Sequence, residues 1–374
     1  MKKEKEQKDS SLPSLIIKGK RITIPIIQGG MGVGVSLYPL ALAVAREGGL
    51  GIVSSAGIDR VVSKRLNKKM STYEAVREEL ELAKAGGGVT GINIMVALMR
   101  DYEDSVKGAI DAGIDVIISG AGLPMTLPTI KSPGDTALIP IVSSARALEL
   151  ICRKWERSGY RPDAVVLEGP LAGGHLGFKF DELVLDSNKL ENLLPPVKET
   201  AQKYGDLPVI VAGGIFTRED ILRFLRLGAD GVQMGTRFLA TEESSATPEY
   251  KQTVVNAGKE DIIVVRRPGS PCGLPFRVIR QAPGFISAER NARKPRCDKG
   301  YVLLRGRDGN WLTCPANSDS GDYFCICNGL LSSAGYNSDK EEPLYTVGTN
   351  GYRVDKILPV KTLMKELITG IVED

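Results

Sequence analysis

Eight short apolar runs, each followed by a segment with helical periodicity, constrain the fold of this chain more than any other feature. The runs span residues 24–31, 50–57, 91–97, 115–122, 137–144, 164–169, 208–215 and 230–239. Strand–helix alternation at this spacing indicates right-handed βαβ units and a parallel sheet. Eight units predict a TIM (β/α)₈ barrel, and the phrases "AGIDV" and "GADGV" before two of the strands favour it. A doubly wound open sheet remains the alternative, because miscounting one or two strands would change the result.

The regular pattern stops near residue 259 and returns with an amphipathic segment over 356–372. Residues 260–345 between them contain Pro, Gly, Cys and Asn but no helical period. Long loops without secondary structure are usually functional. We therefore predict one barrel domain over 15–259 and 346–374, with 260–345 as an irregular insertion that forms a Cys-rich cover or lid. The charged residues 1–14 are predicted to be a disordered tail.

The charge and hydropathy of the chain exclude several classes of protein. The net charge is only +4 over 374 residues, and no basic stripe is present, which argues against nucleic-acid binding. The sequence contains no run of eighteen apolar residues, which is about the length that a membrane-spanning helix needs. The first residues lack the apolar region of a signal peptide. We expect a cytoplasmic enzyme for a small-molecule substrate, with reduced thiols, and leave open a homodimer.

Small residues follow nearly every predicted strand. They are Gly29-Gly30, Ser54-Ser55, Ser119-Gly120, Ser143-Ser144, Gly169, Gly213-Gly214 and Gly235-Thr236. Missing side chains let a ligand approach the backbone, whose N–H groups can hold phosphate oxygens. Any one of these sites, six pairs and the single Gly169, could simply tighten a turn, but seven such sites at one rim indicate a binding site. The last two pairs follow the seventh and eighth strands, where barrels commonly bind phosphate.

Four polar side chains lie within the apolar strands, where each costs free energy unless it is hydrogen-bonded. They are Gln28, Asn93, Glu168 and Gln233. A ring system with several acceptors and an N–H group would satisfy such a set. A phosphate and a polar heterocycle on a barrel rim together suggest FMN, because no P-loop or clean dinucleotide fingerprint is present.

His175 is the only histidine in the chain and lies in the stretch "EGPLAGGHLGF" (168–178). A lone histidine is more often a structural residue than a functional one. This one, however, lies in a glycine-rich, pliable loop directly after the strand "DAVVLEG" (163–169). The carboxyl end of a parallel strand is where α/β folds bind ligands, so we interpret His175 as a catalytic candidate.

Five motifs in this order resemble the nitronate monooxygenase (nitropropane dioxygenase) family of FMN-dependent TIM barrels. They are "PIIQGGMG", "GINIM", "EGPLAGGHLGF", "PVIVAGGI" and "GVQMGTRFL". The same family includes flavin-type enoyl-acyl-carrier-protein reductases. The resemblance implies that His175 is a general acid or base over a flavin. It also implies that FMN is held by Gly29, Gly30, Met31, Asn93, Gly213, Gly214, Gly235 and Thr236, with Gln233 nearby. Our further cofactor-binding candidates are Gln28, Ser143, Glu168, Gly173, Gly174 and Ala212.

Three functions fit these features. The first is oxidation of alkyl nitronates with O₂ to a carbonyl compound and nitrite. The second is an NAD(P)H-dependent reductase for an enoyl thioester or a quinone, with His175 donating the proton that accompanies hydride addition. The third is a flavin-binding scaffold without turnover, against which the intact His175 loop argues.

Five of the six cysteines lie in the predicted insertion: Cys272 in "GSPCGLPFRVI" (269–279), and a group of four at 297, 314, 325 and 327. No C-x₂-C pair is present, so the patterns of a zinc ribbon and a bacterial ferredoxin are both missing. Cys297, Cys314, Cys325 and Cys327 are therefore candidate metal ligands, and ordinary thiols are the alternative.

Overall fold

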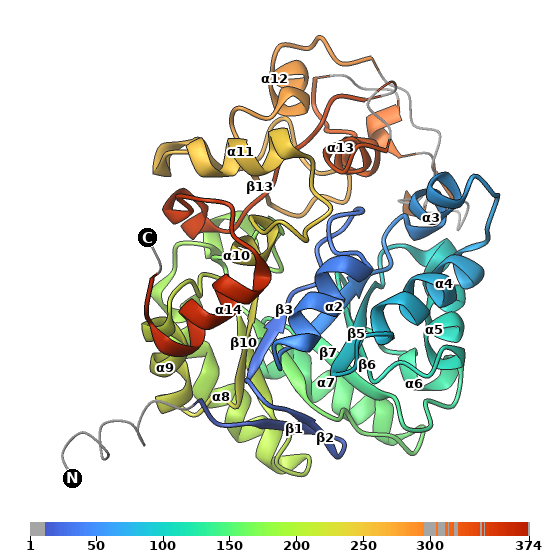
Figure 1. Cartoon of the computed structure of the whole chain (residues 1–374), viewed down its shortest axis with the longest axis vertical. Coiled ribbons are helices and arrows are strands. Elements are labelled where there is room, and N and C mark those ends of the chain that lie inside the picture. The colour runs from blue at the N-terminus through green and yellow to red at the C-terminus, as the bar shows by residue number, and fades with distance from the viewer. Residues whose placement is uncertain are drawn as a thin grey trace.

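The computed structural model confirms the barrel: eight parallel strands close on themselves, with helices around the outside (Figure 1). The strands adjoin in the order β10-β11-β3-β4-β5-β6-β7-β8, and β8 pairs with β10 to complete the ring. All eight predicted runs supply one strand each, and the open sheet is excluded. The strands are β3 (Ile26–Gln28), β4 (Leu50–Ser54), β5 (Val89–Met95), β6 (Val116–Gly120), β7 (Ala137–Val142), β8 (Val165–Glu168), β10 (Val209–Ala212) and β11 (Gly231–Met234).

The structure describes residues 12–294, 304–305, 311–312, 314–317, 321–336, 339 and 341–372. Residues 1–11 of the predicted tail lie outside this set. Of the remaining tail residues, Leu12 is buried in the outer core, so the packed part of the chain begins before residue 15.

Helices shield the outer face of the barrel, because both faces of each strand are apolar. The outer core joins residues such as Val53 and Val211 of the strands to Leu40 and Leu148 of the helices. These helices are α2 (Tyr38–Arg46), α3 (Ile58–Leu66), α4 (Thr72–Lys84), α5 (Met99–Asp111), α6 (Leu127–Ile130), α7 (Ala145–Glu156), α8 (Leu190–Lys203), α9 (Arg218–Arg226), α10 (Thr236–Leu239) and α14 (Val360–Thr369).

An antiparallel hairpin packs against the inner core of the barrel. Its strands are β1 (Leu15–Ile17) and β2 (Lys20–Ile22). The buried Leu15, Ile17 and Ile22 belong to the same apolar cluster as inward residues of the barrel strands, such as Ile52 and Ile118. The hairpin therefore helps to fill the barrel interior, and the opposite, carboxyl end of the strands is where a ligand can enter.

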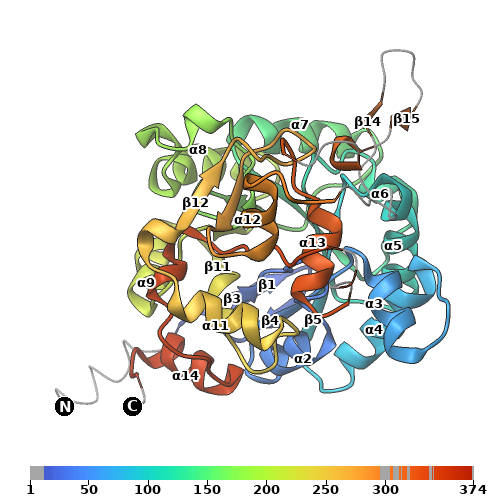
Figure 2. The same ribbon diagram turned by 90° about the horizontal axis from the view of Figure 1, so that it is seen from above.

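A second layer covers the carboxyl end of the barrel, with α11 (Pro248–Asn256), α12 (Pro283–Glu289) and α13 (Ile326–Ser333) above the strands (Figure 2). This layer is irregular for much of its length. It nevertheless contains two short helices, α12 and α13, in a region where the sequence shows no helical period. A seven- or eight-residue helix buried on several sides shows no amphipathic period. Buried residues of α13 include Ile326, Leu331 and Ser333.

The cover has its own apolar cluster, which also extends beyond 260–345. Tyr250 and Val254 of α11 (Pro248–Asn256) pack with Phe276, Phe285 and Phe324. The domain boundaries therefore stay a prediction. The remaining elements are β9 (Gly174–His175), β12 (Ile262–Val265), β13 (Phe276–Ile279), β14 (Leu304–Arg305), β15 (Trp311–Leu312), η1 (Phe180–Glu182), η2 (Asp186–Asn188), η3 (Lys259–Asp261), η4 (Pro315–Asn317) and η5 (Thr349–Arg353).

Among the described helices, none combines the length and the apolar character needed to cross a membrane.

Candidate active site

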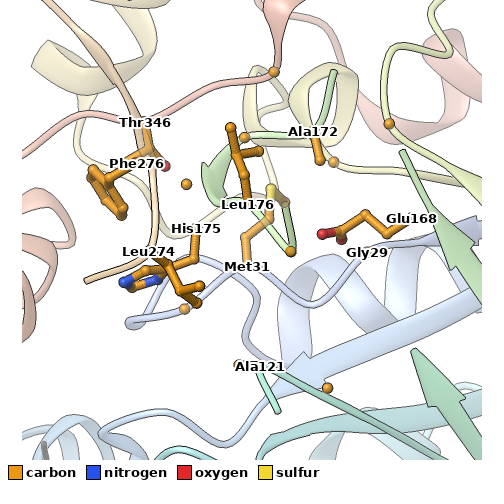
Figure 3. Close-up of a pocket in the computed structure, with 18 of the residues that line it drawn as sticks. Gly29, Met31, Ala121, Glu168, Ala172, His175, Leu176, Leu274, Phe276 and Thr346 are labelled. Carbon is orange, nitrogen blue, oxygen red and sulfur yellow. The ribbon is translucent and has the colours of Figure 1, made fainter. Parts of the chain in front are cut away.

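A pocket of about 1160 Å³ lies between the carboxyl ends of the barrel strands and the cover. It exceeds the roughly 300–1,000 Å³ of ordinary ligand pockets, so it has room for more than one ligand. In the view of Figure 3, Met31 projects between His175 and Glu168. The pocket is thus built from the rim of the barrel below and from loops of the cover above.

Nearly all the predicted site residues meet in this pocket. Those that line it are Gly29, Gly30, Met31, Asn93, Ser143, Glu168, Gly173, Gly174, His175, Ala212, Gly213, Gly214, Gln233, Gly235 and Thr236. Parallel strands place their carboxyl ends at one edge, which explains why residues more than 200 positions apart in the sequence share one space.

Gln28 is the exception, because it does not line the pocket. Its side chain is fully buried and donates hydrogen bonds to the Gly29 carbonyl, at 2.5 Å, and to Ser36 Oγ, at 2.9 Å. It also accepts one from the Ile52 N–H, at 3.0 Å. Gln28 therefore shapes the loop after β3 and is not placed to touch a ligand.

His175 is held more firmly than a pliable loop would hold it. Its strand β9 pairs antiparallel with β13, with His175 opposite Phe276. The two rings make an edge-to-face contact with centroids 4.9 Å apart, and Nε2 lies 2.9 Å from Ser270 Oγ. The expected pliability is therefore wrong: the cover extends a strand onto the loop and fixes the direction of the imidazole.

The neighbour of this histidine that sequence reasoning missed is Cys272. Burial alone raises the pKa of its thiol. A hydrogen bond with His175 and the charge of that ring, together with hydrogen bonds from Ser270 and the Leu274 backbone, outweigh burial and lower the pKa to about 7. The residues around Cys272, "GSPCGLPFRVI", do not predict that it lies near His175, because the histidine is almost a hundred residues earlier in the sequence.

Arg277 is a second missed residue. Its guanidinium, only 6% exposed, donates hydrogen bonds to the carbonyls of Pro170 and Ala172, and burial lowers its pKa to about 10. It clamps the segment that leads from β8 to His175. The sequence does contain a signal for this residue, a charged side chain inside the apolar run "FRVI". It is comparable to the polar side chains Gln28 and Gln233 inside their strands.

Glu168 ends β8 and faces the pocket, and burial raises its pKa to about 7. Within the described residues no donor bonds to its carboxyl. A carboxyl with a raised pKa is protonated more readily in the folded than in the unfolded chain. The free energy of unfolding therefore falls as pH rises from about 4.5 to 7.

We expect Glu168→Gln to raise the free energy of unfolding of the flavin-free protein at pH 8, because the amide removes this penalty. A pKa shift from 4.5 to about 7 corresponds to about 3 kcal/mol at pH 8 and about 1 kcal/mol at pH 5. Urea titrations at both pH values would measure the difference. Glu199→Gln, on the exposed face of α8, is the control and should show no such pH dependence. A gain independent of pH would show that Glu168 does not titrate near neutrality.

One buried acceptor in the pocket has no partner. Gln233 Oε1 receives no hydrogen bond within the described structure, and its residue lines the pocket at the end of β11. A buried acceptor left unpaired costs about 1–3 kcal/mol. Together with the side-chain-free rim formed by Gly213, Gly214 and Gly235, it fits a ligand that offers an N–H group and a phosphate, as FMN does.

The cysteine candidates do not form a metal site in the described part of the chain. Cys314, Cys325 and Cys327 are described, whereas Cys297 lies outside the described residues. Among described residues, no three His, Cys, Asp or Glu side chains gather as a metal site requires.

Comparison with known proteins agrees with this geometry. The family model described as nitronate monooxygenase matches residues 14–370. A Mycobacterium tuberculosis protein named (3aS,4S,5R,7aS)-5-hydroxy-7a-methyl-1-oxo-octahydro-1H-indene-4-carboxyl-CoA dehydrogenase is 30% identical over 308 residues, covering 77% of this chain and 78% of that protein. A probable nitronate monooxygenase of Staphylococcus haemolyticus is 27% identical, covering 65% and 72%.

The solved structure of FabK from Thermotoga maritima superposes with a TM-score of 0.67 at 28% identity, over 92% of this chain and 91% of that one. The fold, the pocket and the family match therefore agree, and the chain belongs to the nitronate monooxygenase family of oxidoreductases.

Proposed function

We propose that this protein is an FMN-dependent oxidoreductase that oxidises alkyl nitronates with O₂ to a carbonyl compound and nitrite. The observation that carries the proposal is His175, the only imidazole of the chain, anchored by β13 and Ser270 at the wall of a glycine-lined pocket. Membership of the nitronate monooxygenase family supports the choice of substrate.

The proposed FMN site uses the residues at the barrel rim. The backbone of Gly213, Gly214 and Gly235 and the hydroxyl of Thr236 would hold the phosphate. Around the ring, Gln233 would accept a hydrogen bond and Glu168, protonated near neutrality, would donate one. The remaining lining candidates, Gly29, Gly30, Met31, Asn93, Ser143, Gly173, Gly174 and Ala212, would shape the cavity around the cofactor.

His175 handles the proton of the substrate in this proposal. FMN held at this rim would supply the electron-accepting chemistry of the reaction. His175 removes the proton next to the nitro group of a neutral nitroalkane, and it only orients a nitronate, which has already lost that proton. Ser270 Oγ, 2.9 Å from Nε2, holds the ring in place, and Arg277 holds the preceding backbone.

The second candidate is an NAD(P)H-dependent reductase for an enoyl thioester or a quinone. Apolar side chains beyond the glycine rim favour it, since Leu98, Leu123, Phe178 and Leu330 also line the pocket and would suit a larger apolar substrate. The CoA-thioester name of the Mycobacterium tuberculosis relative points the same way. Here His175 would donate a proton to the reduced substrate.

Anaerobic mixing separates the two candidates. The purified protein should be yellow and release FMN on denaturation, because the rim offers one phosphate cradle. Under the first proposal, a nitronate should bleach the flavin absorbance faster than NADH or NADPH does, and admitting O₂ should yield nitrite. Fast bleaching by NADH or NADPH alone would favour the reductase. A colourless protein that ignores added FMN would contradict both.

A further inference from the structure

Three side chains from the cover and the β8 segment form a connected cluster at the pocket wall. His175 Nε2 lies 2.9 Å from Ser270 Oγ, and Ser270 Oγ lies 2.9 Å from Cys272 Sγ. Ser270 Oγ therefore links the Cys272 thiol to the His175 imidazole. The cluster joins a thiol to an imidazole, the arrangement that activates a sulfur nucleophile. Neither proposed reaction uses the thiol.

The backbone holds Cys272 against the histidine. The Gly273 N–H bonds to the Ser270 carbonyl at 2.9 Å, which closes a tight turn around the thiol, and the Leu176 N–H bonds to the Pro275 carbonyl at 3.0 Å. The second bond continues the β9–β13 pairing, so the turn and the imidazole belong to one small sheet. The cluster is therefore preorganised and does not depend on a bound ligand.

Residues on either side of the thiol line the pocket, whereas Cys272 itself is not one of the lining residues. Ser270, Gly273 and Leu274 line the cavity on either side of it, and Cys272 itself is half-buried. Leu274 is a large apolar side chain that is 39% exposed, so an apolar molecule has a surface to lie on. Cys152 differs from Cys272 in exposure and in acidity. It is 0% exposed, and burial raises the pKa of its thiol to about 12.

We propose that Cys272, paired with His175, is a covalent modification site for α,β-unsaturated carbonyl compounds that enter the pocket. The thiol proton passes to His175 and the sulfur attacks the β carbon. One S–C bond forms, the C=C π pair moves toward the α carbon, and His175 returns the proton there. The product is a saturated thioether, and nothing is oxidised or reduced. The adduct would lie next to Ser270 and His175 at the pocket wall and block turnover.

The test uses the purified flavoprotein with 2-cyclohexen-1-one as the probe, at neutral pH. Mass spectrometry of digested samples follows the adduct at Cys272, Cys152 and Cys327 with time; Cys327 lines the same pocket from α13. We expect Cys272 to react at least about tenfold faster than either of the other two. The readout is chemical labelling, so it holds whether or not the proposed nitronate oxidation is correct.

His175→Asn tests the pairing itself. If the pKa of the thiol returned from about 7 to 9.0, the thiolate fraction at pH 7 would fall about 50-fold. The stronger nucleophilicity of the more basic thiolate would offset about eightfold of this loss, which leaves a labelling rate about sixfold slower. Cys272→Ala should remove the adduct and protect activity from the probe. Labelling of Cys272 no faster than that of Cys152, or a rate unchanged in a folded His175→Asn protein, would overturn the proposal.

Discussion

Replacing His175 with asparagine should lower turnover by about 10²–10⁴-fold while the protein keeps its flavin, since that is the usual contribution of a positioned general acid or base. The fold should survive, because β9 is held to β13 through backbone hydrogen bonds. Steady-state rates of nitrite release, with the flavin spectrum and a thermal melt recorded on the same sample, would measure the effect.

Two substrates make this test specific. The loss should be greater on a neutral nitroalkane than on the preformed nitronate, because only the former must lose a proton. Equal loss on both would indicate that His175 mainly orients the substrate. Parental rates on both, with FMN fully bound, would show that the histidine is a structural residue and that the base lies elsewhere.

Substituting Gly213 with alanine is expected to weaken FMN binding by on the order of 10²-fold, which is about 2.7 kcal/mol. Gly213 has φ +97°, a conformation that strains alanine, and a Cβ there would lie 2.9 Å from the Gly169 carbonyl oxygen and 3.1 Å from the Ala172 N–H nitrogen. Those backbone atoms belong to the segment that leads to His175, so the strain would displace the rim and the catalytic loop together.

Gly228→Ala is a matched control for this variant. Gly228 has almost the same φ, +98°, but no atom lies within 4 Å of the Cβ position, and the residue follows α9 outside the pocket. Both variants should lose about 1–3 kcal/mol of stability in a urea titration from the strained φ, and Gly213→Ala should lose more, because its Cβ also meets backbone atoms. Only Gly213→Ala should change the dissociation constant of FMN, measured by quenching of flavin fluorescence. Equal affinity in both variants would rule out a cofactor cradle at Gly213.

The barrel could be predicted because its signals are local. A run such as "PVIVAGGI" contains its own evidence for a buried strand that ends in a tight turn. The helix after it, α9, is capped by Thr217, whose Oγ1 accepts a hydrogen bond from the Asp220 N–H. Once the strands are parallel, their carboxyl ends must meet at one edge. The rim glycines and His175 could therefore be assigned to one site without coordinates.

The inner wall of that site could not be predicted in the same way. Polar strand residues all looked alike in sequence, yet Gln28 bonds within the protein whereas Gln233 keeps a buried acceptor unpaired. Which side of a strand end faces the cavity depends on the tilt and register of the closed barrel. No periodicity within a three- or four-residue strand records that choice.

The sequence by itself determined the barrel, the glycine rim and the single imidazole, because each depends on residues close together in the chain. Tertiary structure alone decided what surrounds the imidazole. Ser270 lies 95 residues from His175, and Arg277 lies 107 residues from the Pro170 carbonyl that it holds. Contacts at such separations form only when the cover folds back onto the barrel and adds β13 to β9. The Cys272–His175 pair therefore exists only in the folded protein.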